Sequence, residues 1–313
     1  MNLPPGYTSR PATHDDLADV ATLIDAWQLV HYGEPEASRV ELQFDWAAAW
    51  VAIDRDTRLI HGADNVLTAY AFHATPDPAL RFEVFAAIDP RFEGRGLGSA
   101  ILDWAEVQTR SRMEPGSETR LWNSAPAGNV SAIRLLEGYR YQPIRTVRQM
   151  TIELDPSFDA GPVPDGVTIR RHVAGVDGPV AFAVLNASFA THFGFFEESF
   201  EEWWAQQQAD ETWDPTLGLV AELEGEIVGA SNNGVIEGTG HVFELGVLPE
   251  SQGRGIGRAL LRHSLAMFAA RGIRIGRLGV DTENVTGAFE LYRSVGMVPY
   301  REHRVFEKHL EAD

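Results

Sequence analysis

The stretch 247–261 reads VLPESQGRGIGRALL, and the stretch 88–102, which starts 159 residues earlier, reads IDPRFEGRGLGSAIL. Each runs from an apolar segment through a glycine-rich turn into an apolar-periodic helix. The similarity extends outward in both directions, so the chain is an internal repeat of two homologous halves. The outer matches are Thr8 and Arg10 with Thr168 and Arg170, and NVSAIRLLEGYRY from Asn129 with NVTGAFELYRSVGM from Asn284.

Length and punctuation agree with two domains. The 313 residues are about twice the size of a typical domain. Between the repeats, DPSFDAGPVPDG at 155–166 is rich in proline, aspartate and glycine, which is typical of a linker. We therefore expect one domain over 1–154 and a second over 167–313. Strands and helices mix in each half without strict alternation, which predicts an α+β (mixed α/β) class.

Composition excludes several classes of function. The net charge of -19 opposes nucleic acid and anionic membrane surfaces as partners and favours cationic small molecules. The absence of cysteine excludes disulfides, thiolate catalysis and cysteine zinc sites, and we expect no metal. The N-terminus has no apolar signal region and no stretch of about 18 apolar residues occurs, so we expect a cytoplasmic protein.

The glycine-rich turn QGRGIGRALL at 252–261 places several backbone N–H groups directly before a helix. Such a turn lets an anion approach the backbone closely, and the helix N-terminus adds a partial positive charge. Glycines before helices are also ordinary structural punctuation. The turn lacks the Gly-Lys-Ser/Thr ending of a triphosphate loop and the acidic residue that a dinucleotide fold needs.

Two motifs together resemble the GNAT superfamily of acyl-CoA-dependent N-acetyltransferases. They are V-x-P-x-x-Q-x-x-G-x-G across 247–257 and N-x-x-G-A-x-x-L-Y-x-x-x-G across 284–296, and their tandem arrangement is similar to that of two-domain bacterial acetyltransferases. The resemblance implies two GNAT-like domains, each a twisted mixed, largely antiparallel sheet flanked by helices. It also implies acetyl-CoA as co-substrate and a primary amine of a small molecule as acceptor.

The resemblance further implies which residues hold CoA. Loop amides grip the pyrophosphate, the preceding strand carries the pantetheine and acetyl group and polarises the thioester carbonyl, and the last helix faces the thioester. In the second half these positions are Leu245, Val247, Gln252, Gly253, Arg254, Gly255, Ile256, Gly257, Arg258 and Asn284. In the first half they are Ile88, Gly94, Arg95, Gly96 and Gly98.

Catalysis needs an acid and a base. Tyr292 stands where the family protonates the departing thiolate, for which a phenol is suited. The first candidate base is His241, at a position where many relatives carry a glutamate. Strict strand alternation puts His241 on the face of Val247 and Glu244 on the other face, unless a bulge intervenes. Glu244 is therefore the second candidate, and His241 could instead be an ordinary edge histidine.

The first half lacks these features. Leu136 stands at the place of Tyr292, and Glu93 replaces Gln252 at the start of the loop. A carboxylate aimed at a pyrophosphate is repelled by it, although Glu93 could also turn to solvent. We therefore expect a non-catalytic first half that could still bind CoA weakly and that supplies surface to the other site.

Acidic and aromatic residues fill the variable segment 190–213, where the acceptor is expected to bind. Aromatic faces and carboxylates suit a cation. The same aromatics also follow the spacing of an amphipathic helix, whose role would be core packing. The candidate acceptor residues are His192, Phe195, Glu197 and Trp203. The rival functions are a detoxifying acetyltransferase for aminoglycosides or polyamines, and a CoA-binding sensor without turnover.

Overall fold

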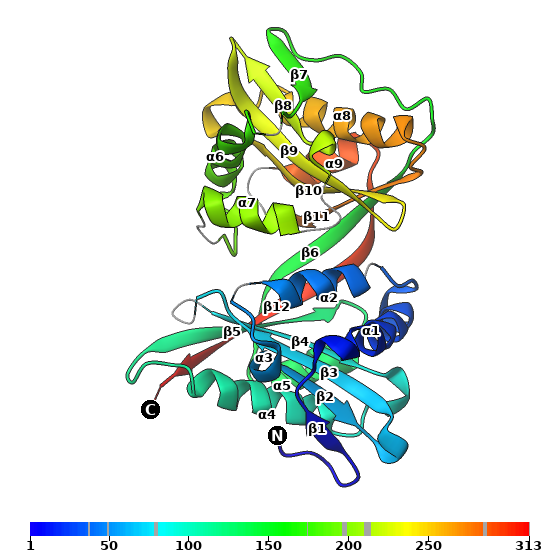
Figure 1. Cartoon of the computed structure of the whole chain (residues 1–313), viewed down its shortest axis with the longest axis vertical. Helices are drawn as coiled ribbons and strands as arrows, with labels where there is room; N and C mark the ends of the chain where they lie inside the picture. Colours follow the sequence, from blue (N-terminus) through cyan, green and yellow to red (C-terminus); the bar gives the residue numbers. More distant parts are fainter. Residues whose placement is uncertain are drawn as a thin grey trace. The chain divides into compact units, whose positions relative to one another are not determined.

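The computed structural model describes residues 1–36, 38–48, 50–77, 81–173, 175–195, 199–209, 214–283 and 287–312. The chain forms two compact units: unit 1 consists of Met1–Thr146 and Glu302–Asp313, and unit 2 of Val147–Arg301. Each is a mixed sheet with helices on both faces, as the sequence predicts (Figure 1). Among the described residues, no helix combines the length and apolar character that a membrane crossing requires.

Unit 1 has the strand order β1-β2-β3-β4-β5-β12, in which only the β4–β5 pair is parallel. Its strands are β1 (Thr8–Arg10), β2 (Thr57–His61), β3 (Leu67–Ala74), β4 (Phe82–Ile88), β5 (Glu118–Pro126) and β12 (Val298–Glu311). Its helices are α1 (Leu17–Tyr32), α2 (Ser38–Ala47), α3 (Ile53–Asp56), α4 (Leu97–Arg110) and α5 (Val130–Gly138). One core lies under α1 and α2, and a second under α4 and α5.

Unit 2 repeats this arrangement with the order β6-β11-β10-β9-β8-β7, in which only β10–β11 is parallel. Its strands are β6 (Gln142–Glu153), β7 (Val167–Arg171), β8 (Leu219–Leu223), β9 (Glu226–Ile236), β10 (Thr239–Val247) and β11 (Ile275–Asp281). Its helices are α6 (Gly178–Phe189), α7 (Phe200–Ala209), α8 (Ile256–Ala270) and α9 (Ala288–Ser294). Residues of α6 pack on one face of the sheet and residues of α8 on the other (Figure 1).

The parallel strands of each unit separate along their length. In unit 2, β10 pairs with β11 only at Gly240 and His241, although β10 continues to Val247. In unit 1, β4 pairs with β5 only over 82–84, although β4 continues to Ile88. The last residues of β4 and of β10 therefore have no ladder partner on the parallel neighbouring strand. These residues lie directly before the glycine-rich turn of each unit.

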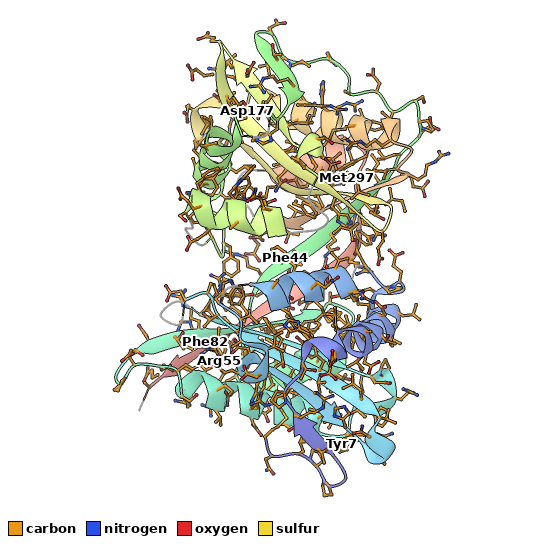
Figure 2. The ribbon with its side chains drawn as sticks, viewed as in Figure 1. Tyr7, Phe44, Arg55, Phe82, Asp177 and Met297 are labelled. Atoms are coloured by element: carbon orange, nitrogen blue, oxygen red, sulfur yellow. The ribbon has the colours of Figure 1, made fainter. Side chains whose placement is uncertain are left out.

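A repeated ion pair anchors the first helix of each unit. Arg10 of β1 binds Asp16 at the start of α1, with Nη2 at 2.5 Å from Oδ1. Arg170 of β7 binds Asp177, labelled in Figure 2, at the start of α6, with Nη1 at 2.6 Å from Oδ2. In both pairs the hydrogen bonds from the arginine are the main cause that lowers the pKa of the aspartate. The match between Arg10 and Arg170 in sequence is thus also a match in structure.

The two units exchange their terminal strands. Residues 147–153 of β6 pair with β11 in unit 2, and residues 303–311 of β12 pair with β5 in unit 1. In Figure 1, β6 and β12 are the strands by which the chain passes from one unit to the other. The boundaries expected at 154 and 313 therefore differ from the structure: 147–154 lie in unit 2 and 302–313 in unit 1. Segment 155–166 packs on unit 2, where Arg262 Nε donates to Ala160 O at 2.8 Å.

Candidate active site

The glycine-rich turn of unit 2 is built to receive an anion. Gly253 and Gly255 have φ angles of +74° and +83°, which side chains rarely adopt, and Gly255 caps the N-terminus of α8. The amides of the first turn, at 256–258, have no acceptor within the helix, and that turn carries no acidic residue. These features fit the pyrophosphate of CoA.

Other predicted CoA residues serve first to fix the turn. Gln252 Nε2 donates to Val247 O at 3.0 Å and so ties the turn to the end of β10. Gly257 lets Leu291 of α9 pack closely on α8, because an added Cβ would lie 3.4 Å from Leu291 Cδ1. The side chains of Val247 and Ile256 are buried in the core, so only their backbone groups can contact CoA, and the side chain of Leu245 is partly buried. Arg254 and Arg258 are exposed, and Asn284 lies outside the described residues.

A bulge in β10 decides which side chains face the acceptor. Val242 is opposite Asn233 and Glu244 is opposite Asn232, so one extra residue, Phe243, interrupts the ladder. Before the bulge Gly240 faces α8, whereas beyond it Gly246 faces α6. The regular alternation expected from sequence is therefore wrong: His241 and Glu244 share the face of α6 and α7, and Leu245 and Val247 face α8.

Glu244 has the environment of a general base. It is partly exposed, and burial raises the pKa of its carboxyl group while hydrogen bonds from Asn232 and Trp203 oppose that rise. Asn232 Nδ2 lies 3.2 Å from Glu244 Oε2. A carboxylate with a raised pKa that remains reachable can take a proton from an ammonium group near neutral pH.

His241 lies on the same face as Glu244. Its ring stacks on Phe243, with centroids 5.9 Å apart, and its backbone is the register partner of Arg277 on β11. The bulge thus brings both candidate bases to one face. The hydrogen bonds to the Glu244 carboxylate favour Glu244 for the role.

Tyr292 lies on α9 and packs against the core formed by α8, α9 and the sheet, which includes Val295 and Met297. Burial raises the pKa of Tyr292 to about 12. Its hydroxyl makes no hydrogen bond within the described part of the chain. The phenol is therefore protonated at all physiological pH values and has a donor to offer.

The candidate acceptor residues come partly together. Trp203 is 8% exposed, lies 5.4 Å from the ring of Phe182 and contacts Glu244, so it combines core packing with the catalytic face. His192 packs edge-on against Phe189 at 4.5 Å; burial lowers the pKa of His192, while Asp281 at the end of β11 opposes that change. Phe195 is half-buried near His192, and Glu197 lies outside the described residues.

Comparison with known proteins agrees with this geometry. The model of the acetyltransferase (GNAT) family matches residues 184–297. A mycothiol acetyltransferase from Streptomyces griseus is 34% identical over 247 residues, which are 76% of this chain and 75% of that protein. The chain belongs to the GNAT acetyltransferase family. Enzymes of this family use acetyl-CoA, and the chain is an N-acetyltransferase.

Two solved structures match the fold along nearly the whole chain. A GCN5-related N-acetyltransferase from Sphaerobacter thermophilus is 31% identical, with a TM-score of 0.87 over 99% of this chain and 98% of that one. A tandem GNAT protein from the clavulanic acid biosynthesis pathway has a TM-score of 0.72 at 16% identity, over 98% of this chain and 99% of that one. The latter likeness concerns the fold alone.

Unit 1 carries different side chains at the positions of the candidate catalytic residues Glu244 and Tyr292. Strand β4 pairs with β3 in unbroken register, so no bulge forms, and Phe85 packs on Trp27 where unit 2 carries Glu244. Leu135 contacts Gly98 as Leu291 contacts Gly257, which makes the buried Leu136 the counterpart of Tyr292. Neither a base nor an acid stands at these places in unit 1.

Glu93 of unit 1 is exposed, as one of the two alternatives from the sequence has it, but its carboxylate contacts a neighbouring side chain. Its Oε1 lies 2.9 Å from Nε2 of His31, at the end of α1. Asn129, the N-cap of α5, lies 3.3 Å from the same nitrogen. These contacts join α1, the glycine-rich turn and α5, beside the end of β4 that has no ladder partner on β5. Gly94 and Gly96 keep positive φ angles, and the side chain of Arg95 donates to Arg91 O.

Sequence reasoning missed Asn232 as a site residue. The only signal was the pair Asn232-Asn233 within the largely apolar stretch IVGASNNGVI at 227–236. Two adjacent amides in a buried strand must each find hydrogen-bond partners. The two adjacent asparagines predict a buried polar network, but they do not show that Asn232 contacts Glu244.

Proposed function

We propose that unit 2 transfers the acetyl group of acetyl-CoA to a primary amine of a small molecule by direct attack, with both substrates bound. The observation that carries this proposal is the bulge in β10. It turns Glu244 to the face of α6 and α7 at the point where β10 has separated from β11 and runs into the anion-binding turn. A base therefore stands beside the open strand edge that the co-substrate needs.

The residues then have distinct roles. Glu244 accepts a proton from the acceptor ammonium, which leaves a nucleophilic amine. As the new C–N bond forms and the C–S bond breaks, backbone amides of β10 polarise the carbonyl oxygen, and the Tyr292 hydroxyl donates a hydrogen bond to the departing sulfur. The amine nitrogen loses a second proton as the amide forms, and that proton ends on the CoA thiol. Glu244 releases the first proton to solvent, so the reaction is balanced.

Charge supports a cationic or polar acceptor. The net charge of -19 attracts ammonium groups and opposes polyanions. The relatives named mycothiol acetyltransferase make the amine precursor of mycothiol the second candidate acceptor. Aminoglycosides and polyamines form the third class.

A thiol-release assay over a panel of amines tests the proposal. The panel contains amino sugars, aminoglycosides, polyamines, amino-acid amides, the amine precursor of mycothiol and a lysine peptide. Turnover with a small amine supports the proposal. Turnover with the peptide alone contradicts the small-molecule assignment, and binding of acetyl-CoA without any turnover indicates a CoA-binding sensor.

Binding of acetyl-CoA should depend on the backbone at Gly255. We expect Gly255→Ala to weaken binding roughly tenfold or more, because its φ of +83° strains any side chain and a Cβ there obstructs approach to the amides. Gly272→Ala is the matched control, since Gly272 has a φ of +77° at the far end of α8. Calorimetry measures both, and equal losses in the two variants would mean that the loss comes from strain alone.

We further propose that unit 1 is non-catalytic and that Glu93 and His31 keep CoA out of it. Calorimetry of the wild type should then show one tight site per chain. Glu93→Gln removes the charge and its ion pair with His31, so a second, weaker site should appear or strengthen. Glu137→Gln, an exposed carboxylate on α5, is the control and should change nothing. Two equal sites in the wild type would overturn this assignment.

A further inference from the structure

The carboxylate of Glu244 is held by two neutral donors from different elements. Asn232 on β9 is only 8% exposed and lies directly opposite Glu244 in the ladder, with Nδ2 at 3.2 Å from Oε2. The side chain of Trp203 on α7, also 8% exposed, hydrogen-bonds the same carboxylate. An indole nitrogen can only donate, so this contact requires Glu244 to accept.

The amide of Asn232 is itself oriented by α7. Its Nδ2 donates to Gln207 Oε1 at 3.0 Å as well as to Glu244. Trp203 and Gln207 are four residues apart on α7 and therefore lie on one face of that helix. Helix α7 and strand β9 thus reach Glu244 through a single connected network, which is complete only when α7 packs on the sheet.

We propose that Asn232 and Trp203 are positioning residues that fix the Glu244 carboxylate and keep it ionised for its role as base. The inference rests on the proposed function, in which Glu244 is that base. Desolvation by itself favours the protonated carboxyl group, which cannot take a proton. A lysine or arginine in contact would hold it ionised but would make it a weak base. Neutral donors stabilise the charge less strongly and leave the carboxylate basic.

Charged groups near this face do not replace the two donors. His241 comes from β10, Arg277 and Asp281 from β11, and His192 from the segment after α6, whereas Glu201 and Glu202 of α7 are exposed. Burial raises the pKa of Glu244, and the two opposing causes are the hydrogen bonds from Asn232 and Trp203. The hydrogen bonds from these two side chains therefore favour the ionised form of Glu244.

The test is the acidic limb of the kcat/KM profile in the full-length chain. Glu244 must be deprotonated to act, so loss of a donor raises its pKa and moves the limb to higher pH. We expect a shift of about one pH unit in Trp203→Phe and in Asn232→Leu, since a hydrogen bond to a charged group is worth about that much. Below the limb, kcat/KM should fall about tenfold, with the KM for acetyl-CoA unchanged.

Asn233→Leu is the matched control. Asn233 is fully buried and donates to Leu217 O at 2.8 Å on the opposite face of β9, away from Glu244. The acidic limb of kcat/KM in Asn233→Leu should stay at the wild-type pH, even if the thermal unfolding temperature of this variant falls. The inference would be overturned if the acidic limb of kcat/KM stayed at the wild-type pH in both Trp203→Phe and Asn232→Leu. In that case any loss of activity would simply match the loss of folded protein. Wild-type activity in Glu244→Gln would instead overturn the proposed function.

Discussion

Glu244→Gln should lower kcat by about 10²- to 10⁴-fold, the usual contribution of a positioned base. Glutamine keeps the shape of the side chain and can still contact Asn232, but it cannot take a proton from the acceptor ammonium. Binding of acetyl-CoA should be unchanged, because the turn at 252–257 is untouched. Steady-state thiol release and calorimetry measure the two quantities separately.

The control for this prediction is His241→Ala. His241 shares the face of α6 and α7 with Glu244, and Asn232 and Trp203 hydrogen-bond the Glu244 carboxylate. We expect the acidic limb of kcat/KM to persist in His241→Ala and to disappear in Glu244→Gln. The reverse pattern would assign the base to His241 and contradict the mechanism.

Tyr292→Phe should lower kcat by roughly 10- to 1000-fold with little change in the affinity for acetyl-CoA. The pKa of about 12 makes the buried phenol a much weaker acid than an ordinary thiol, whose pKa is about 8.5. Full transfer of its proton to the thiolate is therefore uphill. The hydroxyl acts chiefly by hydrogen bonding the charge that develops on sulfur.

The raised pKa of Tyr292 also determines how kcat depends on pH in the alkaline range. Tyr292 must keep its proton to donate, and it does so at every pH well below 12. The kcat profile should therefore show no decline from tyrosine ionisation up to about pH 10. A decline near pH 9 that is absent from Tyr292→Phe would contradict the role of burial at this residue.

Much of the fold could be predicted from the sequence because the internal repeat shows the pattern of each element twice. The apolar segment, glycine-rich turn and helix expected in each repeat are present, as β4 with α4 and as β10 with α8. The long helices begin directly after the glycine-rich turns, at Leu97 and Ile256. The glycine before each takes a left-handed conformation and caps the N-terminus of the helix.

The catalytic geometry was less readable because it depends on contacts between distant segments. The bulge at Phe243 has no marker in the sequence of β10, and it reverses the face of every residue on one side of it. The pairing of Glu93 with His31 joins residues 62 positions apart. No local sequence pattern shows that the end of α1 brings His31 to the glycine-rich turn of unit 1.

The exchange of β6 and β12 has a consequence for the history of the chain. A deletion of the first 160 residues would remove the strand that completes the remaining sheet and would leave 302–311 without its partner strand, as an exposed edge. Neither half can be discarded as one contiguous block of a gene. If unit 1 is non-catalytic, as proposed, selection on folding alone would therefore retain it.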